Sequence, residues 1–173
     1  MLGPTGRGHR LGYAYGCSGP GASSRGYQLA RFFALGAAGY LQQVAFLLSD
    51  GLIETLGTPC DGKALSQAPF RVRLYAADRP GGPPGTDLLT ETLHTAPSRE
   101  GWHTVDLARF ALKTPPAGFF VALEWVYTDD RFLCRYEITD SDKQKRPTSR
   151  YGQALRGVKE DQNLTWAFVA GRG

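Results

Sequence analysis

Short apolar runs separated by glycine and proline are the feature that most constrains the fold of this chain. Its 22 glycines and 11 prolines fall mostly between the apolar runs, in stretches such as GCSGPGASSRG (16–26), DRPGGPPGTD (78–87) and KTPPAG (113–118). Stretches of this composition interrupt helices and favour turns. About eight to ten short strands are predicted between the turns, which is typical of an all-β domain.

The strand pattern is clearest in two of the apolar runs. In FRVRLY (70–75) the apolar residues alternate with arginines and a tyrosine, which is the period-2 pattern of a strand with one buried face. The run GFFVALEWVY (118–127) is apolar on both faces except at Glu124, so a central strand covered on both sides is predicted there. The run GYQLARFFAL (26–35) fits either a strand or a helical turn.

The order of the predicted elements favours a sandwich of two sheets. Strands do not alternate with long helices, which disfavours a parallel nucleotide-binding sheet, so an all-β antiparallel β-sandwich of the jelly-roll or galactose-binding-like type is predicted. Residues 27–170 are predicted to form this single domain, and residues 1–26 to be a flexible N-terminal segment or to contain a first strand. Helical turns are predicted only at 86–94 and 107–112, and the polar stretch 139–150 is predicted to be a mobile loop.

The glycine-rich stretch RPGGPPGTDLL (79–89) does not fit a phosphate-binding loop. Such a loop needs glycines that lead into a helix, with a lysine and a serine or threonine at its start. Here no GK[ST] follows, and prolines remove backbone N–H donors where a phosphate would need them. The glycines are therefore predicted to form a turn between two strands, where they can adopt positive φ.

A series of motifs follows in a fixed order along the chain: PFRVRLYAAD, GGPPGTDLLTE, GWHTVDL, PPAGFFVALEW, YGQAL and LTWAF. In this order they resemble an uncharacterised, Bacteroidetes-type group of bacterial cell-envelope proteins, in which a signal peptide often lies upstream and a carboxypeptidase-regulatory-like domain is sometimes present. The resemblance covers Tyr27 to Trp166. It implies a β-sandwich fold and an extracellular, periplasmic or cell-envelope location, and it implies no particular reaction.

Glu124 and Asp106 are the carboxylates that come closest to a catalytic pattern. A glutamate in an apolar strand can act as a general acid with a raised pKa, and Asp106 would then be the second carboxylate of a glycoside hydrolase or lyase. The favoured interpretation is that Glu124 pairs with Arg71 or Arg73 across the sheet, because a buried charge needs a partner. Asp106 is expected to cap the turn that follows its strand. No catalytic residue is therefore predicted, and the chain is not predicted to be an enzyme.

Aromatic and charged side chains together indicate a binding surface. Tyr75 shares the polar face of its strand with Arg71 and Arg73, and Tyr127 follows the central strand. Aromatic rings beside charged or amide groups are typical of sugar-binding sites, because sugar rings stack on them while sugar hydroxyls form hydrogen bonds. The predicted binding residues are Arg71, Arg73, Tyr75, Glu124 and Tyr127.

The leading hypothesis is that the chain is a non-catalytic β-sandwich module of a secreted or cell-surface bacterial protein, and that it binds carbohydrate. Its predicted partner is a polysaccharide or another envelope protein. The alternative is a structural or assembly domain that packs on a protein partner and binds no small ligand. Trp125 is predicted to lie in the core, whereas Trp102 and Trp166 fit either the core or a binding surface.

Charge and hydropathy argue against two further classes of partner. The net charge is +4, but 15 of the 20 basic residues are arginines scattered along the chain and interleaved with acids. Without a basic stripe or a nucleic-acid motif, nucleic-acid binding is not predicted. No apolar run reaches the length of about 18 residues that a transmembrane helix needs, and residues 1–16 lack the apolar core of a signal peptide.

Metal and redox chemistry find little support in the sequence. Cys17, Cys60 and Cys134 form no CxxC pair, so they are either one disulfide of undetermined pairing or small buried hydrophobic residues. The histidines show no metal-ligand spacing. Aspartates flank the run RFLCRYEIT (131–139) on both sides, which allows a structural calcium ion, but solvated loop charges are the favoured interpretation and no cofactor is predicted.

Overall fold

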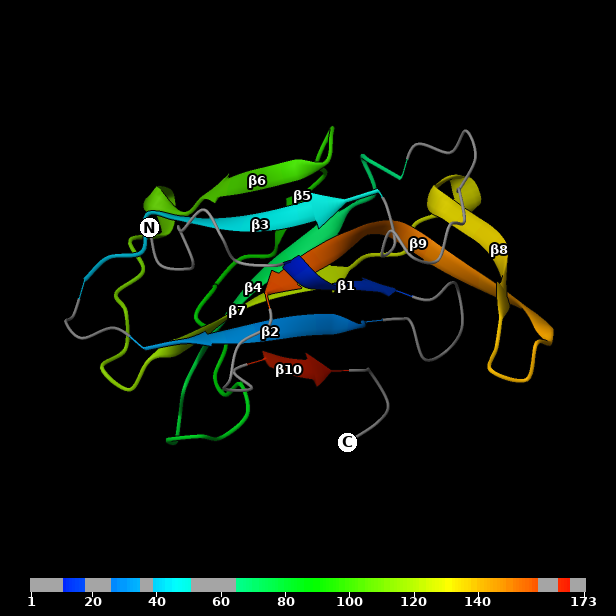
Figure 1. Cartoon of the computed structure of the whole chain (residues 1–173). Coiled ribbons are helices and arrows are strands. Elements are labelled where there is room, and N and C mark those ends of the chain that lie inside the picture. Colours follow the sequence, from blue (N-terminus) through cyan, green and yellow to red (C-terminus); the bar gives the residue numbers. More distant parts are fainter. Residues whose placement is uncertain (1–10, 18–25, 35–38, 51–64, 159–164, 169–173) are drawn as a thin grey trace.

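The chain folds into two antiparallel β-sheets that pack against each other (Figure 1). The computed structural model describes residues 11–17, 26–34, 39–50, 65–158 and 165–168. Within these ranges the helical elements are single 3-10 turns, η2 (Ala108–Phe110) and η3 (Asp130–Phe132), and no helix there is long and apolar enough to cross a membrane. The predicted all-β antiparallel sandwich is therefore confirmed.

Each sheet contains five of the described strands. Sheet A has the order β1–β9–β3–β6, and β8 forms a hairpin with β9. Its strands are β1 (Leu11–Cys17), β3 (Gln43–Ser49), β6 (Gly101–Asp106), β8 (Leu133–Thr139) and β9 (Lys145–Val158). Sheet B has the order β10–β2–β7–β4–β5. Its strands are β2 (Gln28–Phe33), β4 (Phe70–Ala76), β5 (Leu93–Thr95), β7 (Phe119–Trp125) and β10 (Thr165–Phe168).

The main core lies between the sheets and includes alternate residues of β7. Phe119, Val121, Leu123 and Trp125 pack with buried side chains of β3 and β9 in sheet A, and each is at most 8% exposed. The indole Nε1 of Trp125 donates a hydrogen bond of 2.9 Å to the backbone oxygen of Gln153 in sheet A. This bond satisfies the polar group that burial of the indole would otherwise leave without a partner. The predicted core position of Trp125 is confirmed.

The central strand β7 is also covered on its other face, as its apolar pattern predicts. All seven of its residues are buried. Phe120 and Ala122 belong to a second, smaller hydrophobic cluster with Ala30, Tyr75 and Phe32 from the neighbouring strands. This second cluster lies on the outer face of sheet B, and it forms the floor of the surface described below.

The stretch 86–94 does not form the predicted helical turns and instead runs back beside β4. Asp87 forms a β-bridge with Tyr75, and the stretch leads into β5. The carboxylate of Asp78 accepts a hydrogen bond of 2.9 Å from the Thr86 N–H and so closes the glycine-rich turn. The leucines of this stretch are spaced as in a helix, but Leu88 and Leu93 pair with β4 instead, and the Leu89 N–H donates a hydrogen bond of 3.0 Å to Asp87 Oδ1.

Residues 139–150 are not the loop that their polar composition predicts. β8 ends at Thr139 and β9 begins at Lys145, and Asp140 closes the intervening turn by accepting a hydrogen bond of 2.9 Å from the Gln144 N–H. Figure 1 shows this hairpin projecting from the right-hand end of the sandwich. In β8 apolar and polar residues alternate from 134 to 139, whereas the polar start of β9 at 145–149 shows no such alternation.

The two N-terminal segments for which the sequence left alternatives open, 1–26 and 26–35, both contain strands. β1 pairs with β9, so the segment 1–26 contributes a first strand to sheet A, and the run 26–35 contains β2. The register of β1 against β9 shifts near Gly152, which has a φ of +65°. A Cβ atom at this position would lie 2.8 Å from the Cβ of Ala68, so glycine allows β9 to bulge close to its neighbour.

A histidine joins the two sheets at one edge of the sandwich. The Nε2 atom of His103 on β6 lies 2.5 Å from the hydroxyl of Thr95 on β5. Partial burial of the ring lowers the pKa of His103 below its ordinary value. The neutral imidazole is therefore the form that the folded state favours.

We expect the stability of the fold to decrease on acidification because of His103. The unfolded state has the ordinary histidine pKa and binds the proton at a higher pH than the folded state. The contribution of His103 is therefore complete at pH values above the unfolded pKa and is lost as the pH falls through the folded pKa. The variant His103→Gln keeps a hydrogen-bonding group but does not titrate. Urea denaturation between pH 7.5 and 5 should show a smaller loss of unfolding free energy for this variant, and equal losses would contradict the assignment.

Candidate ligand-binding surface

The outer face of sheet B collects most of the predicted binding residues. Phe70, Val72 and Leu74 of β4 point into the core, so the alternate residues of the strand point outward. These outward residues are Arg71, Arg73 and Tyr75. Glu124 of β7 lies directly opposite Arg71 in the register of the sheet, and directly opposite residues share a face. We call this surface the outer B face.

An ion-pair network crosses the outer B face between β7 and β4. Arg71 Nη1 lies 3.2 Å from Oε1 of Glu124, and Arg73 Nη1 lies 3.7 Å from Oε2 of the same carboxylate. Arg73 Nη2 also binds Asp87 Oδ2 at 2.7 Å. The Glu124 side chain is 11% exposed, whereas both arginine side chains are about 30% exposed. The predicted pairing of Glu124 with Arg71 or Arg73 is confirmed, and it involves both arginines.

Tyr75 lies across the face rather than pointing out of it. Its hydroxyl donates a hydrogen bond of 3.0 Å to Gln28 Oε1 on β2, on the far side of β7. Tyr75 lies opposite Phe120 of β7, and Gln28 lies opposite Glu124 of β7. The side chain of Tyr75 therefore passes over Ala122, which is fully buried although it lies on the outer face of the sheet. Burial raises the pKa of Tyr75, and the Arg73 guanidinium lies 5.4 Å from its ring centre. The ring is therefore a neutral, fixed part of the surface.

Two exposed aromatic side chains complete the outer B face at the β10 edge. Trp166 pairs with Ala30 of β2, and Phe168 pairs with Gln28, so both rings project from the same face as Tyr75. Trp166 is 39% exposed and Phe168 is 51% exposed. The sequence left open whether Trp166 lies in the core or on a binding surface, and in the structure it lies on the surface. Phe168 was not predicted from the sequence, although the two-residue spacing of the rings in TWAF is the signal that places both on one face.

The register of sheet B arranges these side chains in two rows across the strands. One row contains Phe168, Gln28, Glu124, Arg71 and His94. The other row contains Trp166, Ala30, Ala122 and Arg73. Each row therefore begins with an exposed aromatic ring at one edge of the sheet and reaches an arginine on β4, three strands away. At about 4.8 Å between neighbouring strands, ring and arginine are separated by about 14 Å.

The structure does not bring Tyr127 to this surface. Its hydroxyl donates a short hydrogen bond to Asp130 Oδ1, and its ring centre lies 5.0 Å from that of Tyr151 in sheet A. Tyr127 thus packs at the end of the sandwich against the side of the main core. The sequence placed it near a strand end, but the chain turns after Trp125 and directs the ring towards the other sheet.

Glu124 and Asp106 do not form the carboxylate pair of a glycosidase. Asp106 lies at the end of β6 in sheet A, whereas Glu124 lies on sheet B. Asp106 Oδ1 accepts a hydrogen bond of 2.9 Å from the N–H of Ala108 and caps η2, as its favoured interpretation predicts. The alternative that depends on these two residues acting together has no geometric support.

The aspartates near β8 are engaged by basic groups and turn amides. Asp129 binds Arg131 at 2.8 Å, Asp130 binds Arg135 at 2.8 Å, and Asp140 lies 2.6 Å from Arg146. Among the residues that the structure describes, no three His, Cys, Asp or Glu side chains group together as a metal site would require. Cys134 is disulfide-bonded, and the side chains of Cys17 and Cys60 lie outside the described residues.

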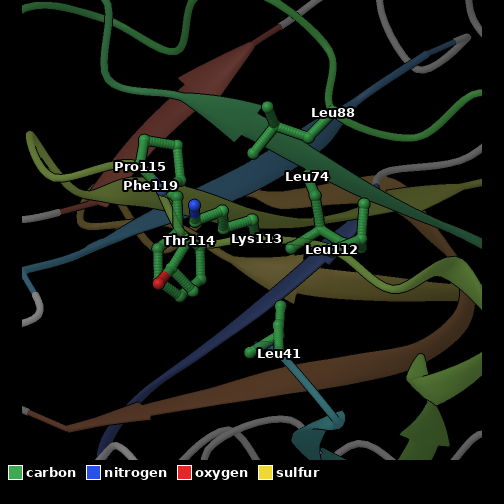
Figure 2. A pocket seen from close by; sticks show the side chains of 8 residues that line it. All are labelled: Leu41, Leu74, Leu88, Leu112, Lys113, Thr114, Pro115 and Phe119. Carbon is green, nitrogen blue, oxygen red and sulfur yellow. The ribbon is translucent and has the colours of Figure 1, made fainter. Parts of the chain in front are cut away.

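Two hollows in the described part of the chain lie away from the outer B face. Figure 2 shows the first, between the sheets, with a volume of about 10 Å³ and a wall that includes Leu41, Leu74 and Phe119. This is about the space of one water molecule, so it is a packing defect rather than a ligand site. The second is a shallow hollow of about 440 Å³ beside Tyr136 on the β8–β9 hairpin.

Comparison with known proteins identifies no relative of this chain: no family model, no curated protein sequence and no solved structure matches it. The binding site proposed below therefore depends on the chain's own residues and their geometry.

Proposed function

We propose that this chain is a non-catalytic binding module whose ligand is a polysaccharide and whose binding site is the outer B face. The observation that carries the proposal is the exposure of Trp166 and Phe168 on the same face as the amide of Gln28 and the ion pairs of Glu124. Sugar rings stack on aromatic rings, and sugar hydroxyls bind amide, carboxylate and guanidinium groups. The outer B face offers both kinds of contact.

The shape of the surface favours a polymer over a small sugar. Small ligands are bound in concave pockets that bury most of their surface. The outer B face is instead a strand surface whose floor is already filled by Tyr75, Phe120 and Ala122, each at most 9% exposed. An extended chain that spans the distance from the aromatic rings to the arginines gains contacts from several sugar units at once.

The charge balance of the surface favours a neutral polysaccharide. Arg71 and Arg73 are both cationic, but Glu124 and Asp87 compensate them within the network. An anionic sugar would have to compete with these carboxylates for the guanidinium groups. Neutral hydroxyls can instead add hydrogen bonds to the exposed parts of the same groups without displacing an ion pair.

The resemblance to bacterial cell-envelope proteins supplies the proposed context. A module that binds polysaccharide on the outside of a cell has access to cell-wall or environmental glycans. The disulfide at Cys134 is compatible with such an oxidising location. The proposal therefore places the chain in a secreted or surface-attached protein.

We expect the single variants Trp166→Ala and Phe168→Ala to weaken polysaccharide binding by at least about tenfold, because exposed aromatic anchors carry much of the energy of such contacts. Calorimetric titration against a panel of neutral and anionic soluble polysaccharides, with pull-down on insoluble ones, measures the effect. Trp102→Ala is the matched control, because Trp102 is 65% exposed but lies on sheet A, opposite Leu47.

The expected result is loss of binding in the two outer-face variants and unchanged binding in Trp102→Ala. Similar unfolding midpoints for all variants would exclude a general loss of structure. If the parent chain binds none of the polysaccharides, or if Trp102→Ala weakens binding as much as Trp166→Ala, the proposed site is wrong.

A further inference from the structure

Gln28 supplies the amide group of the outer B face, and this amide is held in one orientation. The residue is 8% exposed, and its Oε1 atom accepts the hydrogen bond of 3.0 Å from the Tyr75 hydroxyl. Burial raises the pKa of Tyr75, so this hydroxyl keeps its proton and acts as the donor. Because the oxygen of the amide is engaged, its nitrogen is the atom that remains for a ligand.

The nitrogen of Gln28, Nε2, is a donor without a partner in the described part of the chain. It makes no hydrogen bond there, and it is not one of the buried polar atoms that lack a partner. The nitrogen therefore reaches the surface although most of the side chain is buried. An amide nitrogen carries two N–H groups, and here their direction is set by the bond to Tyr75.

The carboxylates of the same surface are already engaged as acceptors. Both oxygens of Glu124 accept hydrogen bonds from Arg71 Nη1, at 3.2 and 3.3 Å. Asp87 accepts from Arg73 through Oδ2 and from the Leu89 N–H through Oδ1. These two carboxylates also balance the charges of the two arginines. A ligand therefore meets mainly donors on a surface without net charge, and the group that fits best is an uncharged acceptor.

We propose that the polysaccharide bound by the outer B face carries acetamido groups, and that Gln28 Nε2 donates a hydrogen bond to an acetamido carbonyl. This inference rests on the proposed function, which assigns a polysaccharide to this surface. An amide carbonyl is uncharged and accepts through two lone pairs, whereas a sugar hydroxyl also brings a proton that needs an acceptor of its own. A surface that mainly donates therefore favours the carbonyl.

Phe168 lies where the methyl group of such an acetamido group would pack. It is directly opposite Gln28 in the pairing of β10 with β2, so the two side chains share a face and their Cβ atoms are about 5 Å apart. The ring is 51% exposed. The carbonyl and the methyl are attached to the same carbon atom, so a carbonyl bound to Gln28 brings its methyl within reach of this ring. Burial of the methyl adds a favourable hydrophobic contact.

Two soluble oligomers of the same linkage and length test the preference for acetamido groups. One is built from N-acetylglucosamine and the other from glucose, so they differ only in the acetamido group that replaces a hydroxyl on each ring. In calorimetric titration we expect the parent chain to bind the N-acetylated oligomer about tenfold more tightly, a ratio that one hydrogen bond and one buried methyl group can supply.

Substitution of Gln28 tests the assigned donor. Gln28→Met keeps the length of the side chain and removes the N–H groups, so the preference should fall below about twofold, while binding of the glucose oligomer should change by less than about twofold. The double variant Tyr75→Phe/Gln28→Met should behave alike, and it leaves no hydroxyl unpaired, since replacing both partners of a hydrogen bond by apolar groups costs little stability. Gln43→Met is the matched control, because Gln43 is exposed on β3 of sheet A, and it should keep the preference of the parent chain.

The possible failures of this inference and of the proposed function differ. A parent chain that binds the glucose oligomer as tightly as the N-acetylated one would overturn the inference and leave the polysaccharide site intact, as would binding only to other members of the polysaccharide panel. A preference that survives in both Gln28 variants, with unfolding midpoints close to that of the parent chain, would overturn the role of Gln28. Failure to bind either oligomer or any polysaccharide of the panel would overturn the proposed function, and this inference with it.

Discussion

Replacing Gly118 by alanine is expected to lower the free energy of unfolding by about 3 to 5 kcal/mol. The φ angle of Gly118 is +95°, which side chains with a Cβ rarely adopt. An added Cβ would lie 2.6 Å from two ring atoms of Phe32 and 2.7 Å from the backbone oxygen of Phe33. The backbone cannot easily move away, because the Gly118 oxygen accepts a hydrogen bond from the Ala77 N–H at 3.2 Å.

Gly101→Ala separates the two causes of this loss. Gly101 has a φ of +107°, but a Cβ there would meet no atom within 4 Å. It should therefore show backbone strain alone, about 1 to 2 kcal/mol, because steric contact is absent. Urea denaturation followed by tryptophan fluorescence gives both values. A Gly118→Ala variant no less stable than Gly101→Ala would show that the contacts with β2 are absent.

Removal of the Glu124 carboxylate is the second large effect that we expect. Glu124→Ala should lower the free energy of unfolding by about 2 to 3 kcal/mol, because it leaves Arg71 and Arg73 without their shared anion beneath the surface. The arginine side chains are about 30% exposed, so water compensates part of the loss. Asp87 also remains bound to Arg73. The loss is therefore smaller than for a fully buried pair.

Two variants control for this interpretation. Glu124→Gln keeps the size of the side chain and one hydrogen-bond acceptor, so it should fall between the parent chain and Glu124→Ala. Glu91→Ala removes an exposed pair with Arg109, in which both side chains are about two-thirds exposed, and should change the free energy of unfolding by less than about 0.5 kcal/mol. Equal effects of Glu124→Ala and Glu91→Ala would mean that Glu124 is not a buried anchor of the outer B face.

The strands with a buried face and the strand β8 were predictable from sequence, but the polar start of β9 was not. In β4 every second side chain is buried in the core, and the sequence FRVRLY therefore alternates apolar with polar residues. In β7 both faces are buried, and the run is apolar throughout except at Glu124. The start of β9, residues 145–149, is polar throughout, so its pattern does not distinguish a strand from a loop.

The candidate surface was predictable only in part for a similar reason. Because side chains alternate between the two faces of a strand, the sequence predicted that Arg71, Arg73 and Tyr75 share one face. Because a buried carboxylate needs a cation, it also predicted that Glu124 pairs with these arginines. Trp166 and Phe168 join that face through the pairing of β10 with β2, which connects residues more than 130 positions apart. Nothing within the sequence of β10 states which strand it pairs with or which face its rings share.

By itself the sequence determined the all-β class, the glycine- and proline-rich turns at 78–87 and 113–118 and the outward set of β4, because these depend on local periodicity and on residues that break helices. The tertiary structure alone decided which strands are neighbours, and with them the rows of the outer B face. Tyr127 illustrates the difference, since the strand that precedes it was identified correctly but its ring lies against the other sheet. Strand neighbours depend on contacts between distant parts of the chain, and local sequence patterns do not encode that choice.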